Sequence, residues 1–145
     1  MWLNLIYSLS LYLAAFAAFY LGASMTYEQF NQHCGSLIAS SYVMQWGNSH
    51  VWKVAGKVFA IGGQSKDGDA TFTFKVSERN YEFLKMSEGY HPAPYFATRG
   101  MKWIQQYDAN TVDDEALIYY INESYRLVSL GLSKKLQKQF GLNQM

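Results

Sequence analysis

Residues 50–76 read HVWKVAGKVFAIGGQSKDGDATFTFKV, and this stretch decides the fold. Val51–Val54 predicts a short strand, Ala55-Gly56 a tight turn and Lys57–Ile61 the returning strand of a hairpin. Gly62-Gly63 and the polar run that follows predict a loop. From residue 70 to 76 apolar and polar residues alternate, which is typical of a half-buried strand. Short turns between consecutive strands favour antiparallel pairing.

Helical signals lie on both sides of this stretch. Thr26 followed by Gln29 forms a capping box, which predicts a helix over residues 27–37. Ser77 is a suitable N-cap for a second helix over residues 78–86. Thr111 is the predicted cap of a long last helix with acidic residues in its first turn. Tyr95–Thr98 and residues 102–107 predict two further strands. The order favours an α+β fold, one antiparallel sheet with its helices on one face.

The first 24 residues, MWLNLIYSLSLYLAAFAAFYLGAS, contain no charged residue and no histidine. Three interpretations stay open for this extension: upstream sequence translated from a start codon set too early, a membrane anchor, and a cleaved signal peptide. About 20 apolar residues suffice to span the ~30 Å hydrocarbon core, but no basic flank sets an orientation. We expect one domain over residues 25–145. The expected location is cytoplasmic, or membrane-anchored or exported if the extension is genuine.

Composition narrows the classes of function. The 145 residues carry 12 basic and 11 acidic side chains, a net charge of +1, which does not describe a strongly basic nucleic-acid binder. The single cysteine, Cys34, excludes an internal disulfide and a multi-cysteine metal site. The three histidines are scattered, and no nucleophile or phosphate-loop motif is present. We therefore expect no cofactor, no metal and no enzymatic activity.

Six short segments resemble the MmcQ/YjbR family, in the family's order and spacing. They are 50–60 (HVWKVAGKVFA), 73–75 (TFK), 92–95 (PAPY), 102–104 (KWI), 124–128 (SYRLV) and 132–135 (LSKK). The resemblance covers residues 25–142, and the first 24 residues depart from it. It implies a bacterial-type protein with a frataxin-like two-layer sandwich, a twisted antiparallel sheet with helices on one face. It also implies a DNA-binding role, and it transfers no catalytic residue.

A candidate DNA interface follows from strand parity. If Phe72 and Phe74 face the helices, the opposite face carries Thr71, Thr73 and Lys75. Lysines beside aromatic rings suit phosphate contacts and base stacking. We expect weak, mainly electrostatic binding through this open sheet face. The candidate residues are Lys53, Lys57, Lys75, Arg99, Lys102, Trp103 and Arg126.

Two other functions stay open at this point. The same aromatic face also fits a protein-interaction module, because tryptophan, tyrosine and arginine dominate binding hot spots. A small-molecule pocket around Trp46, His50, His91 and Tyr95 has less support. The expected partners are therefore DNA or a protein, and a membrane only if the first 24 residues are a genuine anchor.

Overall fold

The computed structural model describes residues 24–108 and 113–145. The predicted extension, up to residue 23, and the predicted helix cap Thr111 lie outside the described residues. In the described part, Asp113 caps the last long helix instead, and its side chain accepts a hydrogen bond from the Glu115 amide. Within these ranges no helix combines the length and the apolar character needed to cross a membrane.

Six strands form one sheet in the order β1-β2-β3-β4-β6-β5, and every neighbouring pair is antiparallel. The strands are β1 (Ser40–Gln45), β2 (Ser49–Val54), β3 (Lys57–Gln64), β4 (Ala70–Lys75), β5 (Tyr90–Pro92) and β6 (Trp103–Gln106). The helices are α2 (Tyr27–Gly35), α3 (Glu78–Leu84), α4 (Asp114–Leu130) and α5 (Lys134–Gln139), with a 3-10 turn η1 (Ala97–Arg99). The predicted hairpin and the predicted capping box of Thr26 and Gln29 are both confirmed.

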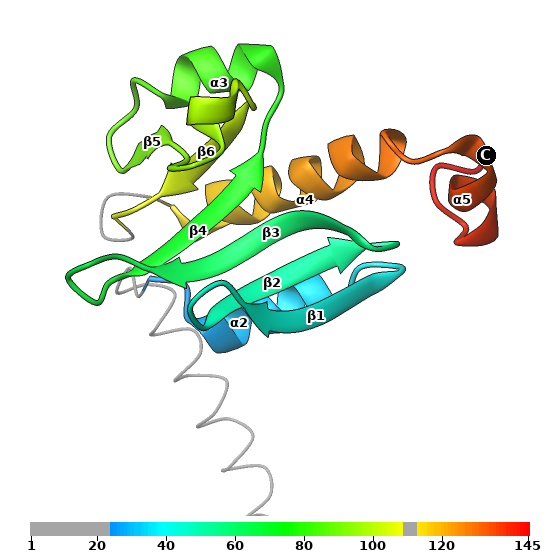
Figure 1. Ribbon diagram of the computed structural model, residues 1–145, viewed down its shortest axis with the longest axis horizontal. Helices are drawn as coiled ribbons and strands as arrows, with labels where there is room; N and C mark the ends of the chain where they lie inside the picture. The colour runs from blue at the N-terminus through cyan, green and yellow to red at the C-terminus, as the bar shows by residue number, and fades with distance from the viewer. Residues whose placement is uncertain (1–23, 109–112) are drawn as a thin grey trace, which may run out of the picture.

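The sheet is twisted, and α2 and α4 cover the face that points away from the viewer in Figure 1. Helix α3 packs near β5 and β6, and α5 extends beyond the end of α4. The predicted α+β architecture is therefore confirmed. The predicted parity of β4 is also confirmed, because Phe72 and Phe74 are fully buried in the core between the sheet and the helices.

The opposite face of β4 is less open than its sequence suggests. Thr71 and Thr73 were expected to face solvent, and both are buried. The cause is the central position of β4 between β3 and β6. Thr73 pairs with Ile61 on one side and with Gln105 on the other, and the Gln105 side-chain amide donates to the Thr73 hydroxyl at 3.1 Å. Longer neighbours therefore shield the short threonine side chains.

Two elements differ from the sequence-based expectation. Strand β1 was not predicted, since its sequence SSYVMQ lacks a regular apolar alternation. The predicted strand over Tyr95–Thr98 is wrong, because residues 94–96 form a turn that continues into η1. Tyr95 has a φ of 73°, a left-handed conformation that ends extended structure just after Pro94. The short strand of this region is β5, which ends at Pro92.

Gly62 and Gly63 lie inside β3, although their sequence predicts a loop. The reason for glycine is close packing, because a Cβ atom at position 62 would lie 2.9 Å from the Phe30 ring of α2. The Phe30 ring also contacts Phe72, with 5.0 Å between the ring centroids. Glycine thus lets α2 approach the sheet directly over β3.

Replacing Gly62 with alanine is therefore expected to destabilise the fold by about 1–3 kcal/mol, the usual cost of overpacking a core. Equilibrium urea unfolding measures this change. The matched control is Gly56→Ala, because no atom lies within 4 Å of a Cβ at that position and its cost comes from the turn conformation alone. Adding Phe30→Leu to Gly62→Ala should recover part of the loss. A fully stable Gly62→Ala protein would contradict the packing argument.

Candidate functional site

A groove lies at one end of the sheet, where β3 begins, β4 ends and α4 ends. Its volume is about 500 Å³. The lining residues are Gly56, Lys57, Val58, Lys75, Phe96, Met101, Trp103, Val128 and Gly131. The turn between β2 and β3 and the C-terminal end of α4 therefore meet at this groove. Its walls are apolar, and its only charged lining side chains among the described residues are the two lysines.

Trp103 is part of the groove floor, but it is not an exposed stacking surface. It lies opposite Lys75 in the β4–β6 pair, as the strand parity predicts. However, only 4% of its surface is exposed, so the predicted exposure is wrong. The ring of Phe96 stacks on it, with 4.6 Å between centroids and 15° between planes. The segment before η1 folds back over β6 and places Phe96 there, since the Ala93 amide donates to the Trp103 carbonyl at 2.9 Å.

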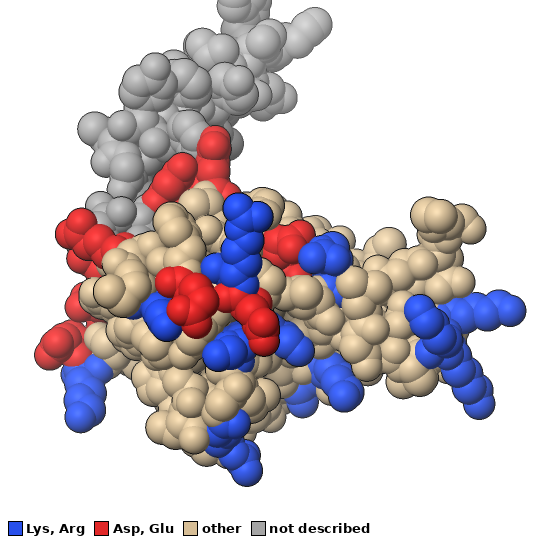
Figure 2. Space-filling view, turned by 90° about the horizontal axis from the view of Figure 1, so that it is seen from above, with Lys and Arg blue, Asp and Glu red and all other residues tan. Residues whose placement is uncertain are grey.

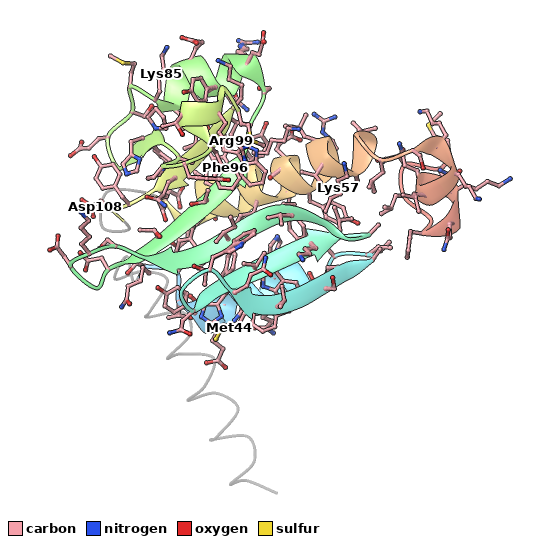
Figure 3. The ribbon with its side chains drawn as sticks, in the orientation of Figure 1. Met44, Lys57, Lys85, Phe96, Arg99 and Asp108 are labelled. Carbon is pink, nitrogen blue, oxygen red and sulfur yellow. The ribbon has the colours of Figure 1, made fainter. Side chains whose placement is uncertain are left out.

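Three of the candidate lysines lie at or beside the groove. Lys57 and Lys75 line it directly, from the start of β3 and the end of β4. Lys53 pairs with Val58, a lining residue, across the β-bulge between β2 and β3. Figure 3 labels Lys57 at this end of the sheet. Three adjacent strands therefore each contribute one of these lysines at this end of the sheet.

The other charged candidates are held by different partners. Arg99 lies in η1, and its guanidinium donates to the Tyr95 hydroxyl at 2.8 Å. Figure 3 labels Arg99 beside Phe96, three residues earlier in the sequence. The Lys102 ammonium lies 4.5 Å from the centre of the Tyr81 ring of α3. Neither side chain lines the groove.

Arg126 also lies off the groove, on α4. Its guanidinium forms an ion pair with Glu123 at 2.9 Å, one turn earlier in the same helix. The hydrogen bond from Arg126 lowers the pKa of the Glu123 carboxyl. Because this exposed ion pair forms within α4 and away from the groove, the position of Arg126 supports a phosphate contact less than that of the other six candidates.

Charge is separated along the length of the domain. None of the six described strands contains Asp or Glu, and the sequence after Glu123 holds four basic residues and no acid. Several acidic residues lie at the opposite ends of β3, β6 and α4, away from the groove. They are Asp67 and Asp69 after β3, Asp108 after β6, and Asp113, Asp114 and Glu115 at the start of α4. Figure 2 shows lysines alone at the right-hand end, where α5 lies, and mainly acids at the left-hand end.

The four residues of the alternative small-molecule pocket are not brought together. His50 lies on β2 and His91 on β5, and three strands separate them in the sheet. His50 accepts from or donates to the Tyr42 hydroxyl at 2.9 Å, while His91 stacks on Tyr107 at 4.7 Å. This interpretation of the sequence is wrong.

Metal and thiol chemistry find no support in the described residues. No group of three His, Cys, Asp or Glu side chains within residues 24–108 and 113–145 is placed to hold a metal ion. Cys34 is completely buried in the core beneath α2. Burial raises the pKa of its thiol, which keeps it protonated and unreactive.

A model of the YjbR family matches residues 36–127. The chain belongs to the YjbR family. This YjbR protein is also similar to the crystal structure of Deinococcus radiodurans protein DR2400, which has a DUF419 domain. The two share 22% sequence identity over 82% of this chain and 90% of that chain, with a TM-score of 0.71, and this likeness shows the fold. No curated protein matches the sequence.

The apolar half of the groove was missed by the sequence analysis of this YjbR domain. Phe96, Met101 and Val128 come from an irregular turn, a loop and a helix end, so no shared periodicity connects them. The available signal was the aromatic pair Tyr95-Phe96 beside two prolines, because proline interrupts regular structure and favours turns. Strand parity predicted a shared face for Lys53 and Lys75; Lys75 lines the groove, and Lys53 pairs with the lining residue Val58.

Proposed function

We propose that this YjbR protein binds nucleic acid weakly and without sequence preference, with the phosphate backbone lying across the lysine-bearing end of the domain. The observation that supports the proposal is the separation of charge. Although the net charge is only +1, the segment after Glu123 carries four basic residues and no acid. We define the lysine end as Lys53, Lys57 and Lys75 around the groove together with Lys134, Lys135 and Lys138 of α5.

The chemistry of the lysine end suits phosphate rather than bases. Lysine ammonium groups are flexible point charges, and they contact phosphates without reading sequence. Lys57 and the three lysines of α5 are exposed, while Lys53 and Lys75 are partly exposed. Gly131 lines the groove and α5 begins at Lys134, so α5 starts three residues beyond it. Four phosphate contacts would give a slope of about −3.6 in a plot of log affinity against log salt.

Base stacking is not part of the proposal. Trp103 is covered by Phe96, so its ring has no free face for a base. We therefore expect similar affinity for single-stranded and double-stranded DNA after correction for their different phosphate spacing. A catalytic step is not part of the proposal either.

The experiment is fluorescence anisotropy with a labelled duplex, measured between about 50 and 200 mM salt. Lys57→Ala combined with Lys75→Ala is expected to weaken binding at low salt and to reduce the salt slope by about two, since each lost phosphate contact removes roughly one unit. Binding to unrelated sequences should weaken equally. The readout is the slope together with the dissociation constant.

Lys66→Ala is the matched control. Lys66 is an exposed lysine in the loop after β3, at the acidic end of the domain, so its loss should leave the slope unchanged. Equal losses for Lys66→Ala and Lys57→Ala would show that only the total charge matters. Absence of binding by the full chain at low salt would overturn the proposal.

A further inference from the structure

Strand β1 is an outer strand of the sheet, and in the described part of the chain it lacks the usual protection. Its sequence, SSYVMQ, contains no charged residue and no proline. All six of its residues pair with β2 in continuous register, and the bulge of the sheet lies between β2 and β3. Natural proteins shield an outer strand with charges, proline, a bulge or a short length, because its free N–H and C=O groups pair readily.

The outer strand at the opposite edge of the sheet, β5, is protected. Strand β5 has only three residues and ends in Pro92, which has no N–H to donate. Helix α3 packs close to β5. Among residues 24–108 and 113–145, the sheet therefore has one protected edge, at β5, and one open edge, at β1.

Large apolar side chains accompany the open edge. Tyr42 and Met44 lie within β1 with 44% and 51% of their surface exposed. Ile38 precedes the strand and Trp46 follows it, and both are more than half exposed. Figure 3 shows Met44 pointing away from the domain at the lower edge of the sheet. Backbone pairing at β1 would also bury these side chains against the occupant.

We propose that β1 pairs in antiparallel orientation with β1 of a second copy of this chain, forming a twofold dimer with a continuous twelve-stranded sheet, twice the six strands of one copy. A twofold contact places the same strand against itself. An uncharged strand meets no like-charge repulsion in that arrangement, whereas a charged one would. Because β5 is protected, the assembly closes at two copies instead of growing into a filament.

Charge along the domain also favours a second copy. Antiparallel pairing reverses the second domain in the plane of the sheet. The lysine end of one copy then lies at the same end of the joined sheet as the acidic β3–β4 loop of the other, which holds Asp67 and Asp69 two strands from β1. Opposite charges across an interface favour association and fix its orientation. A foreign peptide would have no such built-in match.

The test uses the full chain, with its mass measured by light scattering after size exclusion over a range of concentrations. The wild type is expected to give the dimer mass at high concentration. Met44→Lys should shift the mass to that of the monomer, because a lysine on an outer strand opposes pairing. The control is Met86→Lys, which changes an equally long and more exposed methionine just after α3 and should leave the dimer intact.

Single cysteines in β1 supply an independent measurement. The native Cys34 is buried, so a cysteine introduced at position 41, 42, 43 or 44 is the accessible thiol among the described residues. Under oxidation, a cysteine next to the twofold axis should form an intermolecular disulfide, while Met86→Cys should not. A wild type that stays monomeric, a Met44→Lys protein that stays dimeric, or cross-linking at position 86 alone would each overturn the proposal.

Discussion

Replacing Phe72 or Phe74 with alanine is expected to lower the free energy of unfolding by about 3–5 kcal/mol, the range for deleting a buried ring. Both side chains are fully buried on β4, the strand between β3 and β6. Phe72 packs on Phe30 of α2, and Phe74 stacks on Tyr120 of α4 at 5.6 Å with 5° between the planes. Each ring thus joins the sheet to a different helix.

The matched control is Phe83→Ala on α3, because that ring is mostly exposed. Its loss should change stability by no more than about 0.5 kcal/mol, as is usual for surface positions. Urea unfolding of the three proteins gives the comparison directly. A loss below about 1 kcal/mol at position 72 or 74 would mean that the helices bind the sheet less tightly than the structure shows.

The burial of Phe72 and Phe74 is an example of a structural feature that local sequence patterns predict. Alternation along β4 and the turn at Ala55-Gly56 are local signals, so the hairpin and the buried face follow from them. Gly62 and its sequence neighbours instead predict a loop, because glycine is typical of loops and turns. Its role depends on Phe30, which lies 32 positions earlier in the sequence, and no local window contains both.

The sequence also predicts only part of the candidate site. Parity correctly placed Lys75 beside Trp103, because the residues of a strand alternate strictly between the two faces. Parity does not predict which side chains cover a face, and Phe96 reaches Trp103 through a turn that begins at Pro94. Lys102 and Arg126 were selected by charge alone, and their partners Tyr81 and Glu123 lie away from the groove. Residue type identified the cations, but tertiary contacts decided which of them face solvent together.

Ser124 carries the second large expected effect, because its hydroxyl joins α4 to two strands of the sheet. The hydroxyl donates to the Phe59 carbonyl at 2.6 Å and accepts from the Lys75 amide at 2.8 Å. Phe59 is the extra residue of the β3 bulge, so its carbonyl is outside the regular ladder. Lys75 is the last residue of β4. One buried side chain therefore satisfies two backbone groups that the sheet leaves open.

Ser124→Ala is expected to lower the free energy of unfolding by on the order of 2–4 kcal/mol, since each buried group left without a partner costs about 1–3 kcal/mol. Hydrogen exchange at the Lys75 amide should accelerate beyond the global change, because that amide loses its acceptor. The control is Ser129→Ala, which changes a buried serine of the same helix. The Ser129 hydroxyl donates to the Arg126 carbonyl and accepts from the Asn143 side-chain amide at 3.2 Å, and that amide keeps a second partner in Gln137. Neither bond involves the sheet, and the change should cost about 1 kcal/mol. Equal costs for the two serines, or unchanged exchange at Lys75, would show that α4 does not hold the bulge. If the cost is confirmed, the bond that stabilises the sheet also fixes the end of β4 that presents Lys75 to the groove.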